Sequence, residues 1–215
     1  MAILHPDHPK LASGIARLNL DVSDEAIEKL LWYMELLKEW SLTYNLIAPQ
    51  DRSALLGRHM LDSLSIGPFV QAGSLLDVGT GAGFPGLPLA IAMPGLKATL
   101  IDGAGKKIRF IRHVVRTLKL SNVEAMDVRA EALDPELKFD NITSRAFSTL
   151  ANFVSLIKPQ VNQSTRMLAM KGAYPNDELE DLPDWVKVDA VEKLTVPYLQ
   201  AERHLVIMSL STNPG

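Results

Sequence analysis

Two spacings of apolar residues divide the chain near residue 73. Before that point, apolar residues recur every three or four positions, as in the stretch from Ala26 to Leu37, and this spacing predicts amphipathic helices. Ser23 precedes that stretch and is a suitable N-cap, because its hydroxyl can accept a bond from a free backbone N–H. Another helix is predicted from Arg52 to Leu64. Residues 1–72 are therefore expected to form a helical N-terminal extension.

After residue 73, short apolar runs alternate with stretches of helical spacing. The predicted strands span residues 74–78, 98–102, 122–126, 139–143, 166–171, 186–191 and 203–210, and the predicted helices span 86–93, 105–119 and 147–157. Strands that alternate with helices pair in parallel through right-handed crossovers. Only a short connection around Val196 separates the last two strands, which predicts an antiparallel hairpin. Residues 73–215 are therefore expected to form one α/β unit, a mostly parallel seven-stranded sheet with helices on both faces.

The composition is that of an ordinary folded protein. Of the 215 residues, 47% are hydrophobic and 22% are charged, and the formal net charge is −3, so any surface for nucleic acid must be a local patch. The chain has no cysteine, which excludes disulfides, thiolate metal sites and cysteine nucleophiles. No apolar run approaches the roughly 20 residues that span a membrane, and the N-terminus lacks a signal-peptide core. A cytoplasmic protein without a membrane partner is expected.

The stretch Leu75–Gly86 carries the first candidate chemistry. It has the pattern of an apolar strand that ends in a turn containing Gly79, Gly81 and Gly83, where a ligand can approach the backbone closely. Asp102 ends the next predicted strand, where an acid can accept hydrogen bonds from both hydroxyls of a ribose. This combination indicates a cofactor that contains a nucleoside.

Two further acids narrow the choice of cofactor. Asp77 lies beside the turn, where its charge would repel a pyrophosphate but suits the ammonium and sulfonium groups of S-adenosylmethionine. Glu131 and the backbone N–H near Ala130 follow the third predicted strand, where a loop can recognise an adenine edge. The alternatives are structural: Asp77 as a cap of its own turn, Asp102 as a solvated strand end or the N-cap of the following helix, and Glu131 as an exposed loop acid.

Several motifs along the chain resemble one known family. The run Asp77–Leu89, with its Phe-Pro-Gly-Leu-Pro tail, is similar to the cofactor motif of the bacterial small-subunit rRNA methyltransferase G family, also called glucose-inhibited division protein B. Further similar segments lie along most of the chain: His59–Leu64, Gly105–Phe110, Ser144–Phe147, Met170–Gly172 and Glu202–His204. Ser41 and Ile47 depart from the residues usual in this family, but no departure falls in the glycine turn.

The resemblance implies a fold, a reaction and a cofactor. The fold is that of class I S-adenosylmethionine-dependent methyltransferases, a Rossmann-like sheet closed by an antiparallel C-terminal hairpin. The reaction is transfer of a methyl group from S-adenosylmethionine to N7 of a guanine in bacterial 16S rRNA. The cofactor contacts that it implies are Gly79, Phe84, Ala130, Glu131 and Arg145, and the pattern of residues adds Asp77, Gly81, Gly83 and Asp102.

The implied reaction needs positioning more than proton transfer. Guanine N7 carries an in-plane lone pair at neutral pH, so no general base is assigned. Arg145 is the candidate at the reaction face, because it follows a strand at the carboxyl edge of the sheet. Whether it contacts the cofactor, the RNA or both is left open, and the alternative is that it forms a surface ion pair. Ser144 and Phe147 are candidates for holding the guanine, and the alternative for Phe147 is a core residue. Phe84 either covers the cofactor or begins the buried face of the next helix.

A run of basic residues without an acid marks a candidate RNA surface. The candidates lie on the predicted helix over 105–119 and at the end of a later strand: Lys106, Lys107, Arg109, Arg112, Arg116, Lys119 and Lys171. Arg58, His59 and Arg203 extend this patch in one interpretation, and the alternative for the helix is an ordinary solvated face. The expected partner is 16S rRNA, in the small ribosomal subunit or its precursor, bound by a monomer without a metal ion.

Other functions stay open on the sequence. A methyltransferase of a small molecule or a protein has no use for the basic helix. A catalytically silent RNA-binding module has no use for the intact cofactor turn. An NAD dehydrogenase is more distant, because Asp77 opposes a pyrophosphate and no catalytic His or Tyr–Lys pair has clear spacing.

Overall fold

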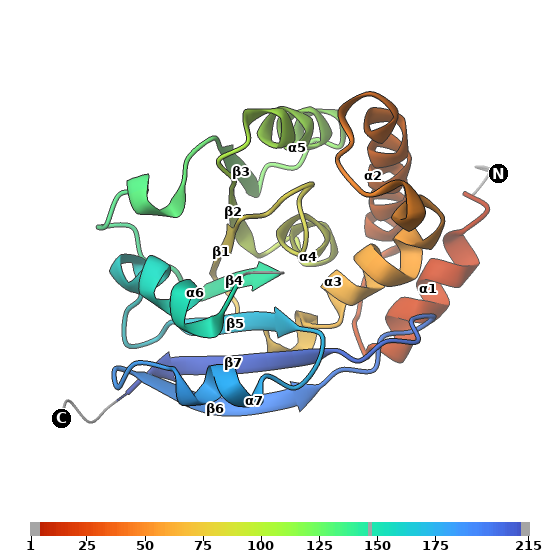
Figure 1. The fold of residues 1–215 in the computed structure, drawn as a ribbon. Helices are drawn as coiled ribbons and strands as arrows, with labels where there is room; N and C mark the ends of the chain where they lie inside the picture. Colours follow the sequence, from red (N-terminus) through yellow and green to blue (C-terminus); the bar gives the residue numbers. More distant parts are fainter. Residues whose placement is uncertain (1–4, 146–147, 212–215) are drawn as a thin grey trace.

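A seven-stranded sheet forms the centre of the protein (Figure 1). The structure is a computed structural model that describes residues 5–145 and 148–211. The strands lie in the order β3-β2-β1-β4-β5-β7-β6. Their bounds are Ser74–Val78 for β1, Lys97–Ile101 for β2, Val123–Met126 for β3, Asn141–Arg145 for β4, Arg166–Lys171 for β5, Val186–Lys193 for β6 and His204–Leu210 for β7. The pairings in this sheet are parallel except the two that β7 makes with β5 and β6, which confirms the predicted mixed sheet and its C-terminal hairpin.

The fourth strand lies later in the chain than the sequence predicts. The prediction covered residues 139–143, whereas β4 runs from Asn141 to Arg145 because its parallel pairing with β5 continues to Arg145. Asp140 lies before the strand, where its carboxylate accepts hydrogen bonds from the backbone N–H of Ser74 at 2.7 Å and from the Ser74 hydroxyl at 2.8 Å. These bonds hold the pKa of Asp140 below its usual value. Arg145 therefore ends a strand instead of following one.

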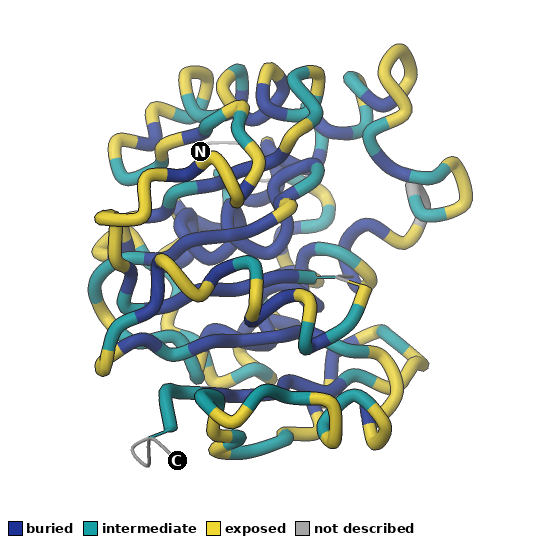
Figure 2. The backbone as a smooth tube through the Cα atoms, turned by 60° about the vertical axis from the view of Figure 1, so that its left-hand side comes forward, coloured by how far each residue is buried: buried dark blue, intermediate teal, exposed yellow. Residues whose placement is uncertain are grey.

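Helices cover both faces of the sheet, as predicted. α4 (Gly86–Ala92) and α5 (Gly105–Thr117) pack on one face together with the N-terminal helices, and α6 (Leu150–Ile157) packs on the other. Successive side chains of a strand point to opposite faces, so Leu75 belongs to the first core and Leu76 to the second. Figure 2 shows the central strands largely buried between more exposed loops and helix faces.

The chain has more helices than the sequence pattern predicts. α1 (His8–Arg17) precedes the predicted helix, which is α2 (Asp24–Tyr44), and the short α7 (Asn176–Glu180) precedes β6. Ser23 is the N-cap of α2, and its hydroxyl accepts a bond from the backbone N–H of Ala26 at 3.3 Å, as predicted. Within the described parts of the chain, no helix is both long and apolar enough to cross a membrane.

The prediction of one continuous helix over residues 52–64 was wrong. The segment consists of a 3-10 turn, a π turn and a short α-helix: η1 (Pro49–Ala54), η2 (Leu56–Leu61) and α3 (Asp62–Leu64). Gly57 in η2 is a weak helix former, and an added Cβ there would lie 3.1 Å from the carbonyl oxygen of Tyr198. The π turn is thus packed closely against the connection between β6 and β7.

Tyr33 joins the N-terminal extension to the turn after β1. Its side chain is buried on α2, its ring centre lies 5.5 Å from that of Phe84, and its hydroxyl donates to the carbonyl oxygen of Ala82 at 2.8 Å. Burial raises the pKa of Tyr33 well above its usual value, so the hydroxyl keeps its proton. The predicted extension and the sheet therefore share one hydrophobic core.

Loss of the Tyr33 hydroxyl should weaken the fold measurably. Tyr33→Phe leaves the buried Ala82 carbonyl without its side-chain partner, and an unsatisfied buried group costs about 1–3 kcal/mol. We expect the free energy of unfolding from urea denaturation to fall by an amount in that range. Tyr44→Phe, the same substitution at the exposed end of α2, is the control and should change it by less than about 0.5 kcal/mol. Equal effects of the two substitutions would contradict this role of the Tyr33 hydroxyl.

Candidate functional site

The turn after β1 has a backbone conformation that glycine adopts more easily than other residues. Gly79, Gly81 and Gly83 have φ angles of +68°, +63° and +109°, a region that glycine enters without strain. A Cβ atom added at Gly79 or Gly81 would meet no other atom within 4 Å. Their backbone therefore borders open space outside the carboxyl end of the strand, where ligands of open α/β sheets bind.

Asp77 is fully buried and holds this turn together. Its Oδ2 atom accepts hydrogen bonds from the Thr80 hydroxyl at 2.6 Å and from the backbone N–H of Gly86 at 2.8 Å. Burial raises the pKa of Asp77 to about 6, although these two hydrogen bonds lower it. A Cβ at residue 86 would lie 2.8 Å from the same oxygen, so the close approach requires glycine. The structure supports the turn-capping interpretation of Asp77, and its contact with a cofactor stays a prediction.

Asp102 links the glycine turn to α5. It directly follows β2, and its Oδ2 atom accepts from the backbone N–H of Gly81 at 3.0 Å and from the Lys107 ammonium at 3.1 Å. Its Oδ1 atom accepts from the backbone N–H of Ala104 at 2.9 Å. The carboxylate is therefore held in one place beside the turn, and Lys107 points back toward it.

A cavity of about 150 Å³ lies outside the carboxyl ends of β1 and β2, and we call it the Gly79 cavity. Gly79, Asp102, Ala130 and Glu131 line it. Ala130 and Glu131 belong to a 3-10 turn, η4 (Ala130–Ala132), that follows β3. Residues that the sequence assigned to one cofactor site thus come together from three separate loops.

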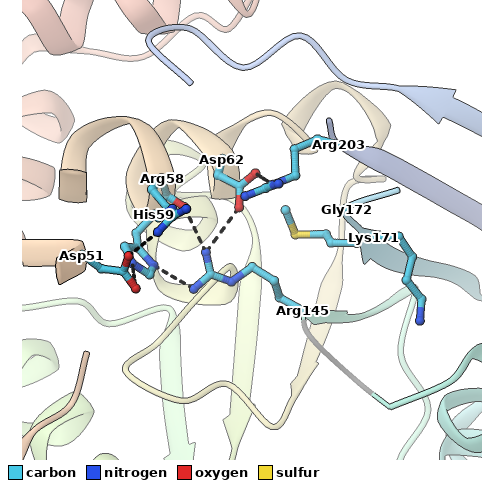
Figure 3. Close-up of a pocket in the computed structure, with 9 residues that line it drawn as sticks. Asp51, Arg58, His59, Asp62, Arg145, Lys171, Gly172 and Arg203 are labelled. Carbon is cyan, nitrogen blue, oxygen red and sulfur yellow. Dashed lines mark hydrogen bonds and ion pairs between the residues drawn. The ribbon is translucent and has the colours of Figure 1, made fainter. Parts of the chain in front are cut away.

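A second pocket of about 400 Å³ lies over β4 and β5, and we call it the Arg145 pocket (Figure 3). Its lining comes from the N-terminal extension, from the ends of β4 and β5, and from the residue before β7: Asp51, Arg58, His59, Asp62, Arg145, Met170, Lys171, Gly172 and Arg203. Among these residues, four carry a positive charge and two are carboxylates. The pocket therefore favours an anionic ligand.

One buried carboxylate orients two arginines of this pocket. The side chain of Asp62 is 3% exposed, and its Oδ1 atom accepts from Arg203 Nε at 2.8 Å while Oδ2 accepts from Arg145 Nη1 at 3.3 Å (Figure 3). Burial raises the pKa of Asp62, and the two guanidinium groups oppose that rise. Loss of the carboxylate would leave two cations close together without their shared partner.

Phe84 and His59 hold Arg145 from another side. The Arg145 guanidinium carbon lies 4.9 Å from the centre of the Phe84 ring, and Nη2 lies 3.0 Å from His59 Nδ1. Because a guanidinium only donates, Nδ1 must accept, and the proton of the neutral imidazole lies on Nε2. Burial, followed by the positive charge of Arg145, lowers the pKa of His59 to about 4. Phe84 is 4% exposed, which favours the core interpretation of this residue.

The sequence pattern did not single out Asp51 and Asp62 as site residues. The sequence signal that could have identified Asp62 is its place in the segment His59–Leu64, which resembles the family. Ser144 is buried, and its hydroxyl donates to the carbonyl oxygen of Val78 at 3.1 Å, so it ties β4 to β1. Phe147, the other candidate for holding a guanine, lies outside the described residues.

The predicted basic surface is present on α5. Lys106, Arg109, Arg112 and Arg116 are exposed along this helix. Three of them, Arg109, Arg112 and Arg116, line a cavity of about 550 Å³ together with Trp40 of α2. Cations that flank an aromatic ring are a common arrangement in surfaces for single-stranded nucleic acid.

Two other lysines of the predicted surface lie elsewhere. Lys119 is not on the helix, because α5 ends at Thr117 and Lys119 follows in a left-handed conformation with φ +53°. Lys171 ends β5 in the Arg145 pocket, where its ammonium lies 2.6 Å from the Glu178 carboxylate. The predicted basic residues therefore belong to two surfaces instead of one continuous patch.

The chain is similar to one family along most of its length. The family model described as rRNA small subunit methyltransferase G matches residues 26–206. A protein of that name from Pseudomonas syringae pv. syringae (strain B728a) is 43% identical over 208 residues, which are 96% of this chain and 97% of that protein. A protein of the same name from Chromobacterium violaceum is 46% identical over 202 residues, which are 94% of this chain and 97% of that protein.

Solved structures share the fold at low sequence identity. A SAM-dependent methyltransferase from Aquifex aeolicus is 19% identical with a TM-score of 0.55, and the match covers 74% of this chain and 94% of that one. TrmN from Thermus thermophilus is 14% identical with a TM-score of 0.53, over 73% of this chain and 53% of that one. These matches confirm the predicted fold class.

Acid should weaken the fold through His59. Its pKa in the folded protein is about 4 against a usual 6.5, so neutral His59 stabilises the fold above pH 6.5, and this contribution is lost as the pH falls toward 4. Between pH 7 and pH 5, the free energy of unfolding should fall by roughly 1–2 kcal/mol more in the wild type than in His59→Asn. Asn does not titrate and places an amide oxygen near the position of Nδ1. Urea denaturation checks this, and the same pH slope in both proteins would contradict a buried neutral His59.

Proposed function

The chain belongs to the rRNA small subunit methyltransferase G family, and we propose that it transfers a methyl group from S-adenosylmethionine to N7 of a guanine in bacterial 16S rRNA. The observation that carries this function is the extent of the family match. Residues 26–206 run from α2 into β7 and include every residue that lines the Gly79 cavity and the Arg145 pocket.

The residues of the Gly79 cavity fit S-adenosylmethionine, which supplies a methyl group on a sulfonium cation. The backbone at Gly79 and Gly81 borders open space, and the Asp102 carboxylate is fixed at the edge of the cavity by backbone N–H groups. Cofactor binding is assigned to the residues predicted from the sequence: Asp77, Gly79, Gly81, Gly83, Phe84, Asp102, Ala130, Glu131 and Arg145. Asp77 acts by holding the turn, and Phe84 acts by supporting Arg145.

The chain contributes orientation to the reaction. Guanine N7 already holds a lone pair, so no residue has to remove a proton from it. The protein must instead hold the base with N7 in line with the methyl group and at reacting distance. Arg145 is suited to this role because it ends β4, which pairs with β1, the strand that leads into Gly79. It is assigned as a positioning residue, and no general base is assigned.

The RNA partner is assigned to the cations outside the cofactor cavity. The assignment covers the basic residues predicted from the sequence: Lys106, Lys107, Arg109, Arg112, Arg116, Lys119 and Lys171. The exposed residues of α5 are the most accessible of these, because Lys107 and Lys171 each pair with an acid. Phosphate contacts of this kind position the substrate, and an unpaired guanine with its local RNA shape supplies the selectivity.

We propose for the reaction the setting that was expected from the sequence. The substrate is rRNA of the small ribosomal subunit or its precursor, and the protein acts in the cytoplasm as a monomer without a metal ion. The part of the chain that the structure describes contains no group of three or more His, Cys, Asp or Glu residues that could hold a metal.

A transfer assay with mapping of the product tests this function. 16S rRNA from a strain that lacks the corresponding enzyme is incubated with the protein and labelled S-adenosylmethionine, and the modified base is then mapped. We expect one methyl group at N7 of a single guanine. Label in a protein or a small molecule, with none in rRNA, would favour a different methyltransferase. No heat of binding on titration with the cofactor would favour a silent RNA-binding module.

Asp102→Ala should weaken cofactor binding. The substitution removes an acceptor for a ribose and also frees the Gly81 N–H, so we expect a loss of roughly 1–3 kcal/mol, the scale of charge-assisted hydrogen bonds. Calorimetric titration with S-adenosylhomocysteine measures the dissociation constant. Glu124→Ala, at an exposed acid on β3, serves as the control and should leave it unchanged. An unchanged constant in Asp102→Ala would remove this residue from the site.

Charge reversal on α5 should separate RNA binding from cofactor binding. In the double variant Arg109→Glu and Arg112→Glu, we expect weaker binding of 16S rRNA and a shallower dependence of affinity on salt, because phosphate contacts release counterions. The dissociation constant of S-adenosylhomocysteine should stay unchanged, because neither residue lines the Gly79 cavity. Equal losses of both affinities would show that the variant is misfolded or that α5 serves the cofactor site.

A further inference from the structure

The Gly79 cavity and the Arg145 pocket lie on opposite sides of the boundary between β1 and β4. The Gly79 cavity is lined at the ends of β1 and β2, by the loop after β3 and by Leu156 of α6, whereas the Arg145 pocket uses the ends of β4 and β5 and Arg203, which directly precedes β7. Because β7 runs antiparallel to β5, its first residue lies at the same edge as the last residue of β5, and Lys171 is paired with His204. The two spaces therefore adjoin along one edge of the sheet.

The Arg145 pocket has the charge of an anion site even after its internal pairs are formed. Asp62 is shared by Arg145 and Arg203, so one negative charge faces two positive charges at a position where the carboxylate is 3% exposed. His59 is neutral, because its Nδ1 atom accepts from Arg145. A partly buried site with excess positive charge favours a ligand that brings its own negative charge.

The donors in this pocket suit a phosphate group. Arg203 donates from Nε to Asp62 and from Nη1 to the carbonyl oxygen of Glu202 at 2.8 Å, and no contact within the described residues occupies Nη2. The Lys171 side chain is 12% exposed, and in the described ranges its ammonium, which has three donors, pairs with one acid, Glu178. Arg203 offers a free guanidinium edge on one side of this pocket, and Lys171 contributes an ammonium to its lining on another side. Both kinds of group commonly bind phosphate oxygens.

On the basis of the proposed function, we propose that the Arg145 pocket binds a phosphate group of the nucleotide whose guanine is methylated. Arg203 and Lys171 donate to the phosphate oxygens, and Asp62 is a positioning residue that orients Arg203 and Arg145. The target nucleotide is then anchored on the β4–β5 side of the edge, next to the cofactor on the β1–β2 side. This anchor is separate from the phosphate contacts on α5, which lies between β2 and β3 in the chain.

Binding of small guanosine ligands tests the proposal directly. The probes are guanosine and guanosine 3′,5′-bisphosphate, which carries phosphate at both positions where an RNA chain continues. Both are titrated calorimetrically with S-adenosylhomocysteine at saturation, so that the carboxylate of the cofactor is already in place. We expect the wild type to bind the bisphosphate at least about tenfold more tightly than guanosine, as charge-assisted bonds predict.

Neutral substitutions locate the phosphate. In Arg203→Gln and in Lys171→Gln, the preference for the bisphosphate should fall by about fivefold or more, while the affinity for guanosine stays unchanged. Lys187→Gln is the matched control, because Lys187 is an exposed lysine on β6 away from the pocket. Asp62→Asn should also lower the preference for the bisphosphate, because Arg203 loses the carboxylate that orients it.

Several results would overturn the proposal. Equal affinities of the wild type for the two ligands, or no measurable binding of the bisphosphate, would show that the pocket holds no phosphate. A preference that falls in Arg109→Gln but not in Arg203→Gln would place the phosphate on α5. A large loss of S-adenosylhomocysteine affinity in Arg203→Gln, with the preference intact, would assign the pocket to the carboxylate of the cofactor.

The same wild-type preparation is assayed for methyl transfer to 16S rRNA, which separates this proposal from the proposed function. Transfer of the methyl group together with equal binding of the two ligands would refute the phosphate site alone. No transfer to rRNA would refute the proposed function itself.

Discussion

The pairing of β1 with β2 on one side and with β4 on the other is the constraint on which the site depends. The strand order reverses at this point, so the loops that follow β1, β2 and β3 gather on one half of the carboxyl edge, and those that follow β4 and β5 gather on the other. The first half holds the glycine turn and Asp102. The second half holds Arg145 and a pocket rich in cations. A nucleoside cofactor and a polyanionic substrate can therefore meet at this boundary, where Arg145 ends β4.

The N-terminal extension is part of this site, because it supplies the carboxylate that Arg145 and Arg203 share. Asp62 reaches Arg145 and Arg203, and His59 accepts from Arg145 at the opposite end of the guanidinium. Tyr33 makes a corresponding connection to the first half through the carbonyl of Ala82 in the glycine turn. The N-terminal helical layer thus contacts both halves of the carboxyl edge. Its contacts hold the long side chains of Arg145 and Arg203 in fixed positions.

Local signals in the sequence were enough to predict the sheet and residues that line the Gly79 cavity. Glycines with positive φ, an acid after β2 and a polar turn after β3 each belong to a short segment, and the parallel sheet brings their strand ends together. The acid–arginine cluster could not be predicted in the same way, because Asp62 lies 83 residues from Arg145 and 141 residues from Arg203 in the chain. The arrangement of the basic residues also depends on the tertiary fold, because the strand order separates Lys171 from α5.

The most direct test of this account is a crystal structure of the protein with S-adenosylhomocysteine. The account predicts the adenosine in the Gly79 cavity, with the ribose beside Asp102 and the adenine beside Ala130 and Glu131, while the Arg145 pocket stays free of the nucleoside. A nucleoside bound in the Arg145 pocket, or away from both halves of the edge, would contradict it.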